Sequence, residues 1–267
     1  MIFYFSGTGN TRWAAQQLSK ATHEQLVFIP DHATGEYAPE LAPGERIGFC
    51  FPVHGWRPPV LVRNFISRLR LQAEGHYTYA LCTAGDNIGE TIEILEKDLR
   101  QVGIVLDAAF SLLMPESYVG LPFMDVDTDA KEQEKKTQAA ERLHEFTPHI
   151  INQVRGIRLL DKGRWPRINS RLLGGYFTRY LITDKPFHVN SNRCVKCGRC
   201  AAVCPVDNIL GGQGEQPRWR RDGSCLTCFS CYHHCPKHAI EYGRRTQHKG
   251  QYYFDHHPAT DNNKSIS

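Results

Sequence analysis

The sequence predicts an α/β fold in which a parallel sheet, covered by helices on both faces, precedes a small cysteine-rich domain. Over the first 155 residues, strand-length apolar runs alternate with segments of helical periodicity, the pattern of a doubly wound sheet. Eight of the ten cysteines lie between residues 194 and 235, in the last third of the chain. A length of 267 residues suits two such domains.

Five strands are expected in the front domain, at the opening run MIFYF and at residues 26–30, 46–52, 78–83 and 108–115. Segments of helical periodicity lie between them, at residues 13–21, 59–70, 92–102 and 130–154. The strand runs are almost continuously hydrophobic, so we expect a parallel sheet that is buried on both faces. Ligands of such sheets bind at the carboxyl ends of the strands.

The loop SGTGNT follows the first strand and opens the first helix. Its hydroxyls and closely spaced N–H groups at a helix N-terminus favour a bound phosphate, on Ser6, Gly7, Thr8, Gly9, Asn10 and Thr11. The loop lacks the lysine of nucleoside-triphosphate loops and the full glycine spacing of dinucleotide-binding loops. The alternative is that it forms only a helix cap and a turn.

The clustered cysteines form two copies of one pattern, C-x2-C-x2-C-x3-C-P, in CVKCGRCAAVCP and CLTCFSCYHHCP. This spacing directs three thiolates to one iron–sulfur cube and the fourth to the other cube, so two [4Fe–4S] clusters are predicted. Cys194, Cys197, Cys200 and Cys235 would hold one, and Cys225, Cys228, Cys231 and Cys204 the other. Zinc is the alternative, but a four-ligand zinc site leaves the repeated third cysteine and x3-C-P step unexplained.

The segment from Pro186 to Gly243 resembles the bacterial two-cluster ferredoxins, and residues 1–155 resemble flavodoxins through SGTGNT, FPVHGW and CTAGDN. The second resemblance implies a flavodoxin-like five-stranded sheet that binds FMN, with the FMN phosphate on the first loop. It implies ring contacts from Pro52, Val53, His54, Gly55 and Trp56, and pyrimidine-edge contacts from Thr83, Ala84, Gly85, Asp86 and Asn87. Flavodoxins commonly stack an aromatic residue from each ring loop, whereas TAGDN contains none. One flavin face is therefore expected to be open.

The whole chain resembles a flavodoxin–ferredoxin fusion family of anaerobic prokaryotes. The expected parts are an FMN-binding domain at 1–155, a packed basic and apolar linker at 156–185, an α+β ferredoxin domain at 186–245 and a tail at 246–267. The tail carries His248, His256 and His257, which we expect at the surface rather than in a metal site.

Charge and composition restrict the classes of partner and the cellular location that we expect for this protein. The formal net charge of +4 treats the cysteines as neutral, whereas two oxidised clusters with their thiolates contribute about −4. We therefore expect no nucleic-acid partner, and no nucleic-acid-binding motif is present. No apolar run reaches the length of a membrane span, and no signal peptide precedes the first strand, so a cytoplasmic location is expected.

The favoured function is electron transfer between redox partner proteins, with one-electron clusters coupled to a one- or two-electron FMN. The main alternative is an FMN-dependent reductase of a small oxidised substrate, in which His54 would donate a proton. A third hypothesis is an iron–sulfur sensor or assembly module that has lost FMN. No catalytic residue is assigned.

Overall fold

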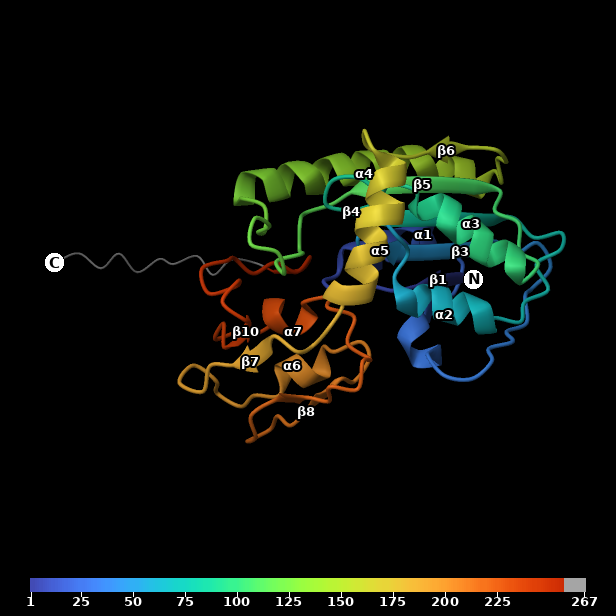
Figure 1. The fold of residues 1–267 in the computed structure, drawn as a ribbon. Coiled ribbons are helices and arrows are strands. Elements are labelled where there is room, and N and C mark those ends of the chain that lie inside the picture. Colours follow the sequence, from blue (N-terminus) through green and yellow to red (C-terminus); the bar gives the residue numbers. More distant parts are fainter. Residues whose placement is uncertain (257–267) are drawn as a thin grey trace.

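A computed structural model describes residues 1–256 of the chain. Its front part is a six-stranded parallel sheet with the strand order β2-β1-β3-β4-β5-β6 (Figure 1). The strands are β1 (Ile2–Tyr4), β2 (Leu26–Phe28), β3 (Ile47–Pro52), β4 (Thr78–Ala84), β5 (Ala108–Leu113) and β6 (Arg158–Leu159). The helices are α1 (Asn10–Thr22), the short η1 (Ile29–His32), α2 (Val60–Arg68), α3 (Thr91–Gln101) and α4 (Asp129–Ile151).

The sixth strand corrects the prediction of five. β6 pairs in parallel with β5, with Arg158 opposite Ala109 and Leu159 opposite Phe110. It falls in the segment that the sequence predicts to be a linker. A strand of two residues at the edge of a sheet has only one neighbour and little buried surface, so it leaves no readable hydrophobic alternation.

Helices cover both faces of the sheet. Helices α2 and α3 pack on one face over a core that contains Phe3 and Phe49. Helices α1 and α4 pack on the other face, where Phe110 and Phe146 lie with their ring centroids 4.9 Å apart. All six strands run in the same direction, so the loops that follow β1, β3, β4 and β5 meet at one edge.

A helix over residues 166–181, here called the linker helix, connects the sheet to the C-terminal part (Figure 1). It consists of the wide turns η2 (Ile168–Leu173) and η3 (Phe177–Leu181) on either side of α5 (Gly174–Tyr176). Its buried Ser170 hydroxyl accepts a bond from the Glu90 N–H (2.7 Å) and donates to the Trp56 carbonyl (2.8 Å). The linker helix is thereby fixed to two of the loops at the sheet edge.

The C-terminal part contains two small antiparallel pairs and two short helices. Strand β7 (Phe187–Val189) pairs with β10 (Ile240–Tyr242), and β8 (Ile209–Leu210) pairs with β9 (Arg218–Trp219). The helices are α6 (Arg199–Ala202) and α7 (Ser230–His233). Left-handed backbone conformations recur 31 residues apart, at Lys196 and Thr227, Gly198 and Phe229, and Asp207 and His238. The two cysteine motifs therefore fold alike.

None of the helices within residues 1–256 is both long enough and apolar enough to cross a membrane.

Candidate functional site

A cavity with about 1120 Å³ of atom-free space lies at the carboxyl edge of the sheet, and we call it the sheet-edge cavity. All three predicted loops line it, through Ser6, Gly7, Thr8, Asn10, Thr11, Pro52, Val53, His54, Gly55, Trp56, Thr83, Ala84, Gly85, Asp86 and Asn87. The one predicted residue that does not line it is Gly9, which turns the chain into α1 with φ of +102°. The structure thus brings together three loops that are far apart in the sequence.

The first loop presents a helix N-terminus to this cavity. No side chain among the described residues caps α1, so the N–H groups of its first turn remain available to an anion. The Ser6 hydroxyl accepts a bond from the Gly9 N–H (3.1 Å), which holds the loop in shape. The Thr11 and Thr83 hydroxyls lie 2.7 Å apart and join the first loop to the third.

The second loop contributes a neutral imidazole. His54 is partly buried in the cavity wall, and desolvation lowers its pKa to about 4, so its ring is uncharged at neutral pH. The ring meets Phe5 edge-on at a centroid distance of 6.0 Å. The neighbouring Gly55 has φ of +56°, and a Cβ atom there would lie 2.6 Å from the Phe177 ring. The linker helix therefore packs directly on this loop.

Several residues that line the sheet-edge cavity were not predicted from the sequence. They are Pro115, Glu116, Ser117, Tyr118, Leu121 and Met124 after β5, Phe177 on the linker helix, and Leu226, Thr227 and Cys228 from the second cysteine motif. The rule that ligands bind at strand ends would have indicated the residues after β5. No sequence signal places Phe177 or Cys228 there, because only tertiary packing brings them to this edge.

Tyr118 and Phe177 supply the aromatic surface that the third loop lacks. Their rings meet edge-on at a centroid distance of 5.3 Å, and both line the sheet-edge cavity. The sequence predicts a face without an aromatic neighbour, since TAGDN has none. The structure adds these two rings to the wall from other segments.

Glu116 places a buried carboxyl group in the same wall. Burial raises its pKa, while its Oε1 atom accepts bonds from the N–H groups of Ser117 (3.0 Å) and Tyr118 (2.9 Å). A Cβ atom at Gly85 would lie 2.1 Å from Oε2 of Glu116. Residue 85 must therefore be glycine as long as the Glu116 side chain stays where it is.

The eight clustered cysteines line two further cavities. The first cysteine cavity, with about 340 Å³ of atom-free space, is lined by Cys194, Cys197, Cys200 and Cys235. The second cysteine cavity, with about 300 Å³, is lined by Cys204, Cys225, Cys228 and Cys231. These are the two crossed sets of the sequence prediction. Within the described residues, no three His, Cys, Asp or Glu side chains are close enough to hold one single metal ion.

Burial raises the pKa of the thiols in the second cysteine cavity and favours their protonated form until a metal replaces the proton. Burial raises the pKa of Cys225 to about 11 and that of Cys228 to about 12. Backbone N–H groups nevertheless point at three of the sulfur atoms, from Asn208 to Cys204 (3.3 Å), from Thr227 to Cys225 (3.4 Å) and from Ala239 to Cys235 (3.2 Å). Such donors stabilise thiolates that are bound to iron.

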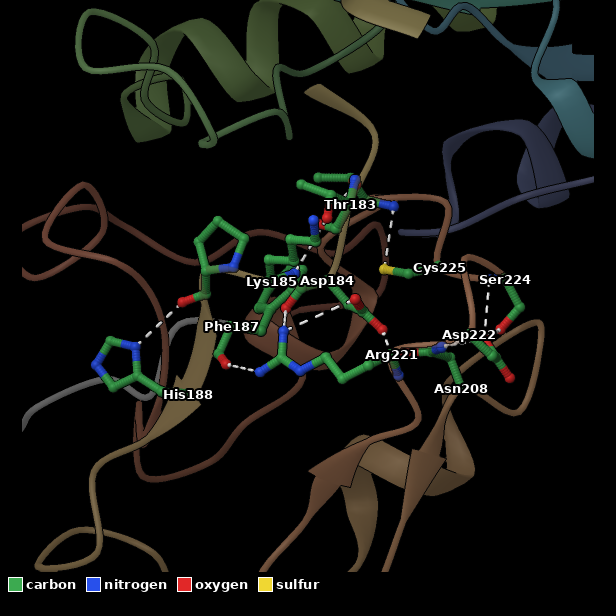
Figure 2. A network of polar contacts seen from close by, with 12 residues as sticks. Thr183, Asp184, Lys185, Phe187, His188, Asn208, Arg221, Asp222, Ser224 and Cys225 are labelled. Atoms are coloured by element: carbon green, nitrogen blue, oxygen red, sulfur yellow. Dashed lines mark hydrogen bonds and ion pairs between the residues drawn. The ribbon is translucent and has the colours of Figure 1, made fainter. Parts of the chain in front are cut away.

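A polar network fixes the loop that precedes the second cysteine motif, and Figure 2 shows its members. The Arg221 N–H donates to the buried Asp184 carboxylate (3.0 Å), and the Arg221 guanidinium donates to the Phe187 carbonyl (2.8 Å). The Asn208 amide donates to Asp222 (3.2 Å) and to Ser224 (2.9 Å). The network joins the end of the linker to the loop that leads into Cys225.

The second cysteine cavity adjoins the sheet-edge cavity, because Cys228 lines both. A Cβ atom at Gly7 would lie 3.0 Å from Cys228 Cβ and 3.6 Å from its Sγ. The neighbouring Leu226 is buried in the core of the sheet domain. The His233 ring also joins the two parts of the chain. Its Nδ1 atom accepts a hydrogen bond from the Tyr252 N–H (3.1 Å), so the proton of the neutral ring is on Nε2. Nε2 therefore donates to the Ser117 carbonyl oxygen, which lies 2.7 Å away.

The described part of the tail returns to the first loop. The Tyr252 hydroxyl donates to Asn10 Oδ1 (2.6 Å), and the Phe254 N–H donates to the Thr8 carbonyl (2.8 Å). The Phe254 ring stacks on Trp13 at a centroid distance of 5.2 Å. The predicted surface residue His257 lies outside the described residues.

Comparison with known families supports the prediction that the clustered cysteines bind iron and sulfur. Residues 187–236 match a family model described as a 4Fe-4S dicluster domain. No curated protein matches the chain. The C-terminal part is therefore an iron–sulfur domain of the ferredoxin type, with its cysteines between residues 194 and 235. This domain supports a role in iron–sulfur electron transfer and implies redox partners.

Proposed function

We propose that this protein carries electrons between redox partners through two [4Fe–4S] clusters and one FMN. The observation that carries the proposal is the position of Cys228, whose side chain lines both the second cysteine cavity and the sheet-edge cavity. With both sites filled, an electron that leaves a cluster in the second cysteine cavity would reach the FMN site with no intervening domain.

The residues of the sheet-edge cavity fit FMN. The uncapped start of α1 suits the phosphate, and glycine at positions 7, 55 and 85 lets Cys228, Phe177 and Glu116 pack closely against the loops that line the cavity. Trp56, Tyr118 and Phe177 offer aromatic surface to a flat ring system. The strand order β2-β1-β3-β4-β5 is also that of the flavodoxin-type doubly wound sheet, which supports the same choice.

The bound groups would supply one-electron chemistry at the clusters and one- or two-electron chemistry at the flavin. The protein's own part is to hold the two sites in a fixed relation. The Lys249 ammonium donates to the carbonyls of Val119 (3.0 Å), Leu121 and Met124, and the Arg245 guanidinium donates to the Gly120 carbonyl (3.0 Å). These bonds attach the wall of the sheet-edge cavity to the C-terminal domain.

We propose the following division of the chain. Residues 1–155 form the FMN-binding domain, 156–185 a packed linker that also supplies β6, 186–245 the two-cluster domain and 246–267 a tail. Iron–sulfur ligation needs free thiols, so a reducing compartment such as the cytoplasm suits the protein.

Two observations favour electron transfer over reduction of a small substrate. The neutral His54, with a pKa of about 4, holds no acidic imidazolium proton at neutral pH to give to a substrate. Tyr118 and Phe177 also add bulky aromatic rings to the cavity wall, which reduces the room for a small substrate. A purified carrier should reduce partner proteins and leave small oxidised compounds unchanged.

The proposal is tested by metal, sulfide and flavin analysis of protein prepared without oxygen and supplied with FMN. We expect about eight iron atoms, eight sulfides and one FMN per chain. Zinc in place of iron would overturn the cluster assignment. A full iron content without bound FMN would overturn the flavin assignment and leave the iron–sulfur part intact.

A further inference from the structure

The outer face of the linker helix is the most apolar exposed surface of the described chain. Among residues 1–256, twelve large hydrophobic side chains are exposed, and six of them lie on the linker helix or directly before it: Trp165 precedes it, and Ile168, Leu172, Leu173, Tyr176 and Tyr180 lie on it. Leu172 alone is 68% exposed. Exposed apolar residues are normally scattered, so a concentration of this kind marks an interaction site.

The same segment of the chain is basic. Residues 162–181 contain five Lys and Arg residues and no Asp or Glu. Glu90 pairs with Arg171 (2.7 Å) and lies 3.8 Å from Arg167, whereas Arg164 and Arg179 have no ion pair within the described residues. These two guanidinium groups lie over aromatic rings instead, Arg164 over Trp165 and Arg179 over Tyr180, each at 5.3 Å.

The inner face of this helix forms part of the sheet-edge cavity. Phe177 lines the cavity, and a Cβ atom at Gly174 would lie 2.2 Å from the Gly55 carbonyl oxygen. A helix with its side chains is about 10–12 Å across. A molecule seated on the outer face is therefore separated from the cavity by little more than the helix itself.

We propose that the outer face of the linker helix docks an acidic redox protein that exchanges electrons with the group in the sheet-edge cavity. The inference rests on the proposed function for its electron-transfer part. Arg, Tyr and Trp are the side chains that dominate protein–protein contacts, and the unpaired arginines complement an acidic surface. A second copy of this chain would bring the same positive charges face to face.

The test measures binding of an acidic plant-type [2Fe–2S] ferredoxin as the probe, by titration at several salt concentrations. Arg164→Glu/Arg179→Glu should raise the Kd about tenfold at low salt and flatten its salt dependence. Leu172→Ser/Tyr176→Ser should raise the Kd by a similar factor and leave the salt dependence unchanged. The matched controls Arg218→Glu/Arg244→Glu and Val105→Ser/Leu210→Ser change exposed residues elsewhere and should stay within about twofold of wild type.

Three results would overturn the docking proposal. Equal Kd values for the helix variants and the controls would remove this face from the contact. A dimer in solution that Tyr176→Ser dissociates would assign the face to a second copy. Sedimentation with phosphatidylglycerol vesicles that Leu172→Ser abolishes would assign it to a membrane surface. FMN and iron contents are measured on the same samples. A protein that binds the probe through this face but contains no FMN would support the docking proposal and refute the proposed function.

Discussion

At the scale of single residues, the cysteines of the two motifs have different neighbours although their spacing is the same. Cys228 contacts the first loop of the sheet domain through Gly7, whereas its counterpart Cys197, 31 positions earlier, is exposed. The two proposed [4Fe–4S] sites are therefore inequivalent. The first faces solvent and suits exchange with an external partner, and the second suits exchange within the molecule.

Cys204→Ala tests the crossed assignment. It should remove the cluster of the second cysteine cavity and spare its sequence neighbours Cys194, Cys197 and Cys200, so that about half of the iron remains. The reciprocal variant Cys235→Ala should spare the cluster near Cys228. Iron analysis and electron paramagnetic resonance of the reduced variants check both outcomes, and loss of the opposite cluster in each would refute the assignment.

The variant His54→Gln tests the charge state of the His54 imidazole through the pH dependence of protein stability. The folded-state pKa of about 4 lies below the ordinary 6.5, so the unfolded chain binds the extra proton first as the pH falls. The stability that His54 contributes is present above pH 6.5 and is lost toward pH 4. Wild type should lose about 2 kcal/mol more than His54→Gln between pH 7 and pH 5.

Urea unfolding at matched FMN content measures this difference, with the exposed His144→Gln as the control. Parallel stability curves for wild type and His54→Gln would show that the imidazole does not change its charge on unfolding in this range.

At the scale of elements, the linker helix depends on two adjacent glycines in different ways. A Cβ atom at Gly174 would lie 2.2 Å from the Gly55 carbonyl oxygen, whereas one at Gly175 would have the Arg57 Nη1 atom at an ordinary 3.5 Å. Gly174→Ala should destabilise the protein by about 1–3 kcal/mol because the helix must move off the loop. Gly175→Ala should be neutral or stabilise it by up to about 1 kcal/mol.

Denaturant unfolding measures both changes, and FMN titration should show weaker binding for Gly174→Ala alone. Equal stability of the two variants would contradict the close packing of the helix on Gly55.

The elements with regular hydrophobic patterns could be predicted from the sequence, whereas the features that depend on tertiary contact could not. The main strands, α2 and α4 follow from continuous or periodic apolar runs, and SGTGNT marks the start of α1. β6 is too short to leave a pattern. Phe177 and Cys228 reach the sheet-edge cavity only because the linker helix and the C-terminal domain close over the strand ends, and no local spacing records that closure.

At the scale of the whole molecule, the two parts of the chain pack directly against each other and are not merely joined by a flexible tether. Leu226 is part of the core of the sheet domain, and Val119 is part of the core of the C-terminal domain. We therefore expect electron transfer from the clusters to the flavin to proceed without domain motion.

Rapid mixing after single-turnover reduction of the clusters tests the fixed arrangement. The rate of flavin reduction should be independent of protein concentration and of solvent viscosity. A rate that falls as glycerol is added would indicate domains that must move to meet. Gly7→Val, which would press on Cys228, should slow the step, and Gly175→Ala, whose added Cβ atom would make only an ordinary contact at 3.5 Å, is the control.

The contact of the tail with the first loop has a consequence for biosynthesis. Tyr252 and Asn10 are 242 residues apart, so the loop cannot be closed until almost the entire chain has left the ribosome. The wall that Cys228 and Leu226 contribute also requires a folded cluster domain. On the proposed function, we therefore expect iron insertion to precede stable retention of FMN, and cells starved of iron should accumulate a chain that lacks both cofactors.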